Sequence, residues 1–222
     1  MRRVVYATSS SYKLDENGIF VEHATLPDGS PVRTHFRFDI RRVSIKETLE
    51  IAVGEMVRAE AARAYASLKV PCVVEHAGLI YQDYLTEPED KQYPGGLTKP
   101  MWNSLGERFL DETHARGRSA VARAVVGYCD GQSVRTFVGE TAGTIADRPR
   151  GERRFYWDTV FIPDREDGTP GDKTYAEIVA DPDLGLVHKV VVLSQSSKAM
   201  LRMLEWMQGA ERPFLWPDDH HG

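Results

Sequence analysis

The feature of the sequence that most limits its fold is a long helical pattern followed at once by a strand pattern. Apolar residues recur at helical spacing over Ser44–Leu68, while the opposite face carries charged residues, among them Glu60. Pro71 ends this pattern, and Pro71–Glu75 is apolar and β-branched enough to predict a buried strand. This succession favours an α/β fold in which helices cover a sheet.

The other segments extend the same organisation. We expect a hairpin-like pair from Ile19–His23 and Thr34–Asp39, with a turn at Asp28-Gly29. Further strands are predicted at Arg3–Thr8, Ala120–Cys129, Ser133–Ile145, Trp157–Pro163 and Val187–Leu193, and further helices at Met101–Leu110 and Ser197–Met207. This order predicts one mixed α/β domain over residues 1–210, followed by a C-terminal tail at 211–222.

Composition excludes several classes of function. The 222 residues carry a formal net charge of −5, so a broad basic surface for nucleic acid is not expected. No apolar run reaches the roughly 18–20 residues that cross a bilayer, so we expect a cytoplasmic protein without a membrane partner. Cys72 and Cys129 are too few for a disulfide framework or a four-ligand zinc site.

Two polar segments follow predicted strands. Thr8, Ser9 and Ser10, followed by Lys13, offer hydroxyls, N–H groups and a cation that could cradle phosphate oxygens. The same pattern is also typical of a simple helix N-cap. In Val73–Leu79, Glu75 and His76 lie at the strand end, where α/β sheets usually bind ligands. The alternative interpretation is that both are solvated side chains at an ordinary strand end.

A third segment combines aromatic and charged residues. Phe155, Tyr156 and Trp157 next to Asp158 could stack a nucleobase and accept hydrogen bonds from its edge, although aromatic runs also build cores. The arginines before them could bind phosphates or lie in a solvated turn; they are Arg148, Arg150, Arg153 and Arg154.

Taken in order, these segments resemble the inosine triphosphate pyrophosphatase family over roughly Val4 to Met207. The resemblance is densest from Phe137 to Pro163. There a glycine-containing strand is followed by Pro149-Arg150-Gly151 and then by Phe155-Tyr156-Trp157, called the aromatic step below. Further matching motifs are Thr8 with Lys13, Val74-Glu75 with Leu79, Tyr93-Pro94-Gly95 with Lys99, Thr174-Tyr175-Ala176-Glu177, and Ser194 with Lys198-Ala199-Met200.

The resemblance implies an elongated, two-lobed α/β fold with a central nucleotide cleft, usually in a homodimer. It implies cleavage of a nucleoside triphosphate to a monophosphate and pyrophosphate with Mg²⁺. The catalytic residues it indicates are His76 and Glu75, which would also be the metal ligands. The substrate-binding residues it indicates are Thr8, Ser9, Ser10, Lys13, Arg42, Ala77, Lys99, Phe155, Tyr156, Trp157, Asp158, Lys189, Gln195 and Ser196.

The sequence departs from the family at the residues expected to bind the metal and activate water. Arg42 stands where the family has a metal-binding Glu, with Asp39 and Glu47 near enough to be alternatives for that position. His76 stands where the family has the Asp that acts as base and metal ligand. Mg²⁺ prefers hard oxygen ligands, so we expect weakened Mg²⁺ binding, use of Mn²⁺, or no metal. Arg42 could instead hold phosphate, with His76 as a neutral base and Glu75 taking over a metal or base role.

The residues expected to bind the nucleobase also differ from those of the family. Gln195-Ser196 replaces a His-Arg pair, Lys189 is offset by one position, and Tyr156 and Thr159 replace Gly and Pro. These changes predict an altered base preference, because glutamine both donates and accepts hydrogen bonds. The alternatives are a nucleotide-binding or regulatory protein with impaired catalysis, and a different nucleotide reaction such as glycosidic-bond cleavage.

Overall fold

The computed structural model describes residues 1–44, 48–152 and 155–209. The described part contains one mixed sheet of seven strands in the order β2-β1-β3-β5-β6-β7, with β4 paired to β3. The strands are β1 (Arg2–Ala7), β2 (Phe36–Arg41), β3 (Cys72–Tyr81), β4 (Pro94–Gly95), β5 (Ser119–Cys129), β6 (Val134–Ile145) and β7 (Phe161–Pro163).

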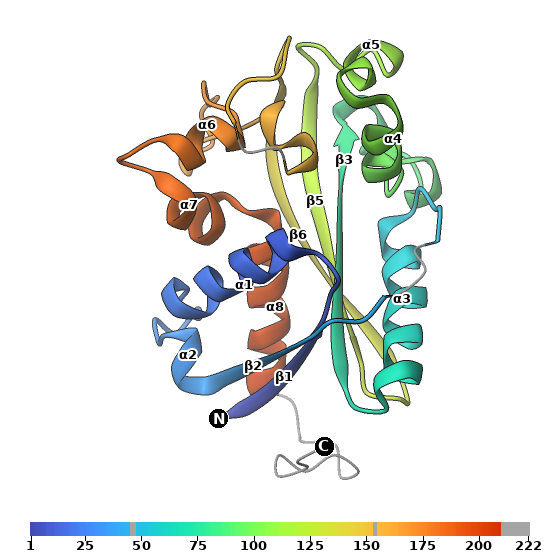
Figure 1. Cartoon of the computed structure of the whole chain (residues 1–222), viewed down its shortest axis with the longest axis vertical. Helices are drawn as coiled ribbons and strands as arrows, with labels where there is room; N and C mark the ends of the chain where they lie inside the picture. Colours follow the sequence, from blue (N-terminus) through green and yellow to red (C-terminus); the bar gives the residue numbers. More distant parts are fainter. Residues whose placement is uncertain (45–47, 153–154, 210–222) are drawn as a thin grey trace.

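The helices occupy both faces of the sheet and its upper end (Figure 1). The α-helices are α1 (Ser11–His23), α2 (Val32–His35), α3 (Val53–Leu68), α4 (Thr98–Leu105), α5 (Phe109–Glu112), α6 (Tyr175–Ala180), α7 (Gly185–His188) and α8 (Gln195–Gly209). The short 3-10 helices are η1 (Gln82–Tyr84), η2 (Glu89–Lys91), η3 (Gly106–Arg108) and η4 (Tyr156–Thr159), and η5 (Lys189–Leu193) is a π-helix.

The long strands β3, β5 and β6 run through both lobes of an elongated molecule (Figure 1). Helix α3 packs on one face of these strands, and α8 packs on β5 and β6 from the other face. Helices α4, α5 and α6 lie around the upper ends of the strands. This arrangement confirms the mixed α/β, two-lobed fold predicted from the sequence.

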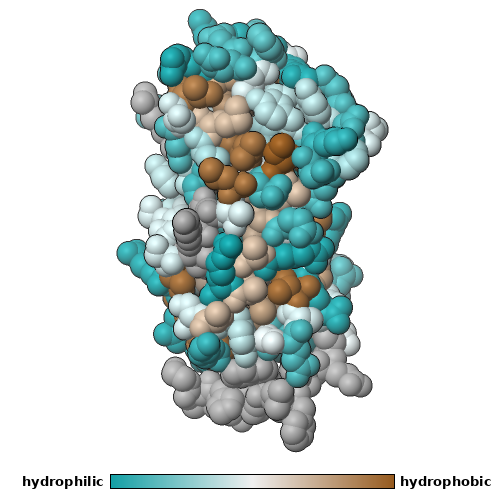
Figure 2. Space-filling view, turned by 90° about the vertical axis from the view of Figure 1, so that its right-hand side faces the viewer, coloured by the Kyte–Doolittle hydropathy of each residue, from teal (hydrophilic) through white to brown (hydrophobic). Residues whose placement is uncertain are grey.

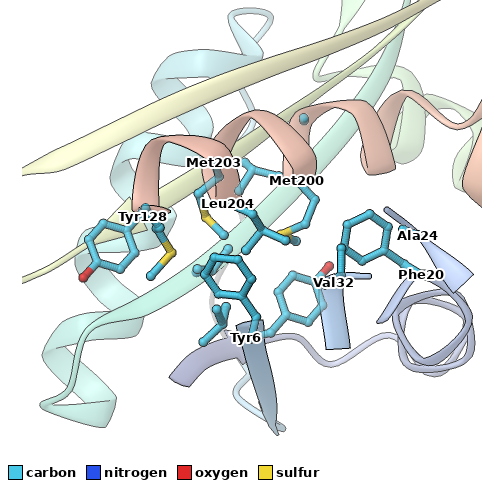
Figure 3. Close-up of a cluster of buried hydrophobic side chains, with 14 of the residues drawn as sticks. Tyr6, Phe20, Ala24, Val32, Tyr128, Met200, Met203 and Leu204 are labelled. Atoms are coloured by element: carbon cyan, nitrogen blue, oxygen red, sulfur yellow. The ribbon is translucent and has the colours of Figure 1, made fainter. Parts of the chain in front are cut away.

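Three apolar clusters hold these layers together. The cluster in Figure 3 joins α1 and α8 to the sheet through Phe20, Met200, Met203 and Leu204, which are each 3% exposed or less. A second cluster fills the upper lobe around Tyr81, Phe109, Leu110, Phe161 and Tyr175. A third lies under α3 and contains Val53, Val57, Ala61, Ala64, Cys72 and Cys129.

The hairpin of β5 and β6 confirms the prediction for Ala120–Cys129 and Ser133–Ile145. Its turn forms because Asp130 Oδ1 accepts the backbone N–H groups of Gln132 at 2.9 Å and Ser133 at 2.8 Å. Gly131 adopts φ +92° there, a conformation that other residues rarely adopt. Helix α8 likewise confirms the helix predicted at Ser197–Met207.

The predicted hairpin of Ile19–His23 and Thr34–Asp39 is wrong. Ile19–His23 is the last part of α1, and β2 pairs in parallel with β1. A short apolar run fits either period, and here the cap at Ser10 starts a helix that continues through this run.

Val187–Leu193 was also expected to be a strand, but it forms α7 and the π-helix η5. Lys189, Val190 and Leu193 are buried there. Packing of these side chains outweighs the preference of β-branched residues for strands.

Three predicted elements have different bounds. The long helix begins at Val53 rather than Ser44, because the Gly54 N–H is capped at 2.7 Å by the Glu89 carboxylate, which lies far along the chain. The predicted strand Trp157–Pro163 contains the 3-10 helix η4 before the short β7. The predicted helix Met101–Leu110 is divided between α4, η3 and α5.

The tail at 211–222 lies outside the described residues, so the domain boundary at 210 stays a prediction. Glu47, an alternative to Arg42 at the position of the metal-binding Glu, lies outside them as well. In the ranges that the structure covers, no helix is both long and apolar enough to cross a membrane. The face that carries α3 and α4 is mainly hydrophilic, with apolar side chains gathered in patches along its middle (Figure 2).

Candidate active site

One cleft gathers nearly all the residues that the sequence singled out. It is lined by the loop after β1, the first turn of α1, the middle of β3, the start of α4, the segment around η4, η5 and the start of α8. The predicted residues that line it are Thr8, Ser9, Ser10, Lys13, Glu75, His76, Ala77, Lys99, Phe155, Tyr156, Trp157, Asp158, Lys189, Gln195 and Ser196.

Arg42 is the predicted residue that is not part of this lining. It lies directly after β2, its side chain is exposed, and its neighbour Val43 lines the cleft instead. Glu16 and Glu60 line the cleft but were missed by the sequence reasoning. Glu60 was predicted on the charged outer face of the long helix, yet it is only 5% exposed.

The loop after β1 ends in a helix N-terminus that faces the cleft. Ser10 is the N-cap of α1, and its Oγ accepts the backbone N–H of Lys13 at 3.5 Å. The Ser10 N–H in turn donates to Thr8 Oγ1 at 3.2 Å. The 13-residue helix presents its positive end here, next to a lysine, so this end of the cleft suits an anion.

A buried carboxylate lies beside this loop. Glu75 accepts hydrogen bonds from the Tyr6 hydroxyl at 2.8 Å and the Ser196 hydroxyl at 2.7 Å, and Lys13 Nζ lies 3.5 Å from its Oε1. Burial alone would raise the pKa of Glu75, but the Lys13 charge and the two hydroxyl donors outweigh it and lower that pKa. Burial and the Glu75 charge raise the pKa of Tyr6 well above its usual value.

A second ionic group lies at the other end of the cleft. Lys189, with a side chain only 4% exposed, lies 2.6 Å from Glu16 Oε1 and 3.1 Å from Asp158 Oδ2. The π-helix η5 carries this lysine into the interior, where two carboxylates balance its charge. Glu16 lies one helical turn after Lys13, and that spacing was the signal that could have placed it in the site.

The aromatic step, Phe155–Trp157, lies next to this ionic group, because Lys189 Nζ is 5.5 Å from the Phe155 ring centroid. Phe155 stacks on Tyr12 of α1 with 4.8 Å between ring centroids, and Tyr156 lies 4.8 Å from Phe155 on centroids as well. Lys99 Nζ lies 5.5 Å from the Tyr156 ring centroid. Tyr156 adopts φ +46°, a left-handed conformation that favours glycine, so the chain keeps a glycine-like backbone with a bulky side chain.

Gln195 begins α8 and faces the cleft with one end of its amide fixed. Its Oε1 accepts the Tyr175 hydroxyl at 3.1 Å, so the amide NH₂ is the end available to a ligand. Gly139 explains how α8 approaches so closely, because a Cβ on this residue would lie 2.1 Å from the Gln195 carbonyl oxygen.

The two described arginines of the third segment, Arg148 and Arg150, do not line the cleft. Arg150 donates to the Asp172 carbonyl at 3.0 Å and lies 3.4 Å from Glu177. Glu177 belongs to a capping box at the start of α6, in which Thr174 is the N-cap. Arg148 does not line the cleft, and Arg153 and Arg154 lie outside the described residues.

The donors in the cleft do not fit Mg²⁺. Within the described part of the chain, no group of three or more His, Cys, Asp or Glu residues could hold a metal ion. Glu75 is already bonded to two hydroxyls and a lysine, and the imidazole of His76 is a softer ligand than Mg²⁺ prefers.

These features define an α/β protein with a two-ended ligand cleft, cationic and hydroxylic at one end and aromatic at the other. The model of the Ham1 family matches residues 4–195, and the chain belongs to this family. This match confirms the family relationship predicted from the motifs.

Individual relatives agree with this assignment. The chain is 32% identical over 185 residues to the dITP/XTP pyrophosphatase of Methanopyrus kandleri, covering 81% of this chain and 88% of that protein. It is 29% identical over 196 residues to the inosine triphosphate pyrophosphatase of Yarrowia lipolytica, covering 86% and 92%. The structure of a HAM1 protein from Coxiella burnetii shares the fold, with TM-score 0.61, 19% identity and coverage of 93% and 100%.

Proposed function

We propose that this chain hydrolyses a nucleoside triphosphate to a monophosphate and pyrophosphate. The observation that carries the proposal is the cleft in which a helix N-terminus with a lysine faces an aromatic step. The names of the relatives, dITP/XTP pyrophosphatase and inosine triphosphate pyrophosphatase, support the same reaction class.

The roles follow from the ends of the cleft. Thr8, Ser9 and Ser10 with Lys13 bind the phosphate groups, whose charge the helix N-terminus favours. Hydrolysis needs a base that takes a proton from the attacking water, and we assign that role to His76, which is 5% exposed in the wall of the cleft. The leaving pyrophosphate remains at the cationic end.

The aromatic end binds the base with an altered preference. Gln195 offers its NH₂ as a donor, and Asp158 offers a carboxylate as an acceptor. The backbone of Tyr156 has a conformation that favours glycine, but this residue carries a ring. The ring narrows the space for the base beside Phe155. We propose that this set, rather than the phosphate end, distinguishes one base from another.

A second candidate is a nucleotide-binding protein that does not hydrolyse. The specific observation in its favour is the poor fit of the cleft donors to Mg²⁺, described above. Under this alternative His76 contacts the nucleotide but activates no water. We keep Mn²⁺ and metal-free turnover as conditions of the test, together with Mg²⁺.

The test is a panel of nucleoside triphosphates with Mg²⁺, with Mn²⁺ and with no metal, in which the nucleotide product and pyrophosphate are both identified. Monophosphate with stoichiometric pyrophosphate from one substrate supports hydrolysis, and His76→Ala should then lower kcat at least about 100-fold. Measurable binding without product supports the second candidate. Release of a free base would show glycosidic-bond cleavage instead.

A paired substitution separates lost catalysis from a wrong substrate. Arg42→Glu combined with His76→Asp restores the two carboxylates expected in the family, of which the one at position 76 lies in the cleft lining and the one at position 42 beside it. If this variant gains Mg²⁺-dependent cleavage and the unsubstituted chain has none, hydrolysis by the unsubstituted chain is refuted. A homodimer and a cytoplasmic location also remain proposals, which light scattering of the purified chain and cell fractionation test.

A further inference from the structure

Glu75 connects three elements that carry different parts of the cleft. Its Oε2 accepts the hydroxyl of Tyr6 in β1 at 2.8 Å, and its Oε1 accepts the hydroxyl of Ser196 in α8 at 2.7 Å. Lys13 of α1 lies 3.5 Å from the same Oε1 and also donates to the Glu75 carbonyl oxygen. One side chain therefore joins the phosphate-binding loop to the start of the helix that holds Gln195.

These contacts leave Glu75 poorly suited to bind a metal. Its side chain is 7% exposed, and a cation on its oxygens would lie close to the Lys13 ammonium, which repels it. A carboxylate acting as a base needs an accessible lone pair, whereas a hydroxyl already donates to each oxygen of the buried Glu75 carboxylate. The same donors hold the ionised Glu75 carboxylate in one position.

We propose that Glu75 is a positioning residue, which holds Lys13 at the phosphate end and Ser196 at the base end of the cleft. The proposal rests on the proposed function for the identity of the ligand. Loss of the Glu75 charge releases Lys13 into several rotamers, so a bound phosphate loses a preorganised cation. Loss of the Ser196 contact loosens the start of α8, and with it Gln195.

The experiment measures binding rather than turnover, with two probes that each occupy one end. Inorganic pyrophosphate without metal reports on the Lys13 end, and a set of unphosphorylated purine and pyrimidine nucleosides reports on the aromatic end. Glu75→Gln keeps the size and one acceptor oxygen but removes the charge. We expect it to weaken pyrophosphate and nucleoside binding at least about tenfold each.

Variants that remove one donor at a time show whether the carboxylate acts through its hydrogen bonds. Ser196→Ala removes the hydrogen bond to Oε1, and Tyr6→Phe removes the hydrogen bond to Oε2. We expect pyrophosphate binding to weaken at least about threefold in each variant. Ser197→Ala, at the neighbouring buried serine of α8, is the matched control and should leave pyrophosphate binding unchanged.

The outcomes are distinct from those of the proposed function. Lost pyrophosphate binding in Glu75→Gln, with the control intact, supports the positioning role of Glu75 even if no triphosphate is cleaved. Binding of both probes unchanged in Glu75→Gln overturns it, and so does an unsubstituted chain that binds no pyrophosphate. Mn²⁺ affinity, followed by electron paramagnetic resonance, should change less than about threefold in Glu75→Gln; a larger loss identifies Glu75 as a metal ligand and refutes the proposal. If Glu75→Gln does not fold, pyrophosphate binding by the two donor variants decides.

Discussion

Replacing Lys189 with methionine tests how much the buried ionic group of Lys189, Glu16 and Asp158 stabilises the fold. Lys189 lies between two carboxylates, at 2.6 Å from Glu16 and 3.1 Å from Asp158. The side chains of the three residues are 4%, 13% and 6% exposed, so water screens them little. Methionine keeps much of the apolar stem of lysine but leaves two negative charges without their shared cation.

The expected loss follows from this burial. Breaking a buried ion pair by removing one partner costs about 3–5 kcal/mol of unfolding free energy, because an uncompensated charge remains. Glu16 and Asp158 both line the cleft, through which water can reach them once the lysine is gone. We therefore expect a loss near the lower limit, about 3 kcal/mol, for Lys189→Met at neutral pH.

The assay is urea unfolding followed by circular dichroism, with unfolding free energies extrapolated to zero urea. Adding Glu16→Gln to Lys189→Met removes one of the stranded charges and should recover at least about 1 kcal/mol, which a double-mutant cycle reports as coupling. Lys173→Met is the control, because Lys173 is 44% exposed beside Asp181 and water screens this pair, so its loss should change stability little. Equal losses for the two lysines, or no coupling with Glu16, would refute the buried ionic group.

Four further predictions concern stability and reactivity. Thr174→Ala should lower the unfolding free energy by about 2 kcal/mol, since it removes an N-cap and leaves the Arg150 carbonyl without its hydroxyl donor. Gly139→Ala should cost about 1–3 kcal/mol because its Cβ meets backbone of α8 at 2.1 Å, whereas Gly18→Ala, a helical position with open space, should gain about 0.5–1 kcal/mol. The lowered pKa of Glu75 contributes stability above its usual value of 4.5 and loses it as the pH falls, so the stability advantage of the unsubstituted chain over Glu75→Gln should shrink between about pH 5 and pH 3. Burial raises the pKa of Cys72 to about 12, so its thiol should react with an aromatic disulfide reagent at pH 8 only after unfolding.

Each of these predictions has an outcome that contradicts it. Thr86→Ala, in an exposed loop, is the comparison for Thr174→Ala and should stay within about 0.5 kcal/mol of the unsubstituted chain; equal losses would show that the capping box contributes nothing. A stabilising Gly139→Ala would mean that α8 does not approach β6 as described. A constant difference between pH 5 and pH 3 would show that Glu75 keeps its usual pKa. Rapid labelling of the folded chain would place Cys72 at the surface.

The sequence predicted the parts of the fold that local patterns determine. The β5–β6 hairpin was predictable because its alternation continues on both sides of Asp130-Gly131, and the turn chemistry is local. Helix α8 was predictable because Met200, Leu204 and Met207 repeat at helical spacing. The cleft residues were predicted by motif resemblance, and the fold brings all of them except Arg42 to one cleft.

The remaining features depend on partners far along the chain. The start of α3 is fixed by Glu89, whose carboxylate caps Gly54 across 35 positions, and no local pattern reports such a contact. Val187–Leu193 has a strand-like composition, but burial of Lys189 in a π-helical turn decides its conformation. Glu60 looked like part of a solvated face because helical periodicity shows which residues are polar, not which polar residues line a cleft.

Helix α1 makes the two ends of the cleft interdependent. Lys13 reaches Glu75 at one end, and Glu16, one turn later on the same face, reaches Lys189 at the other. Tyr12 of the same turn stacks on Phe155 of the aromatic step. A shift of α1 at Lys13 therefore also moves a partner of Lys189 and a neighbour of the aromatic step. Because one helical turn supports both ends, an interpretation of this segment as a phosphate loop alone accounts for only part of its contribution to the cleft.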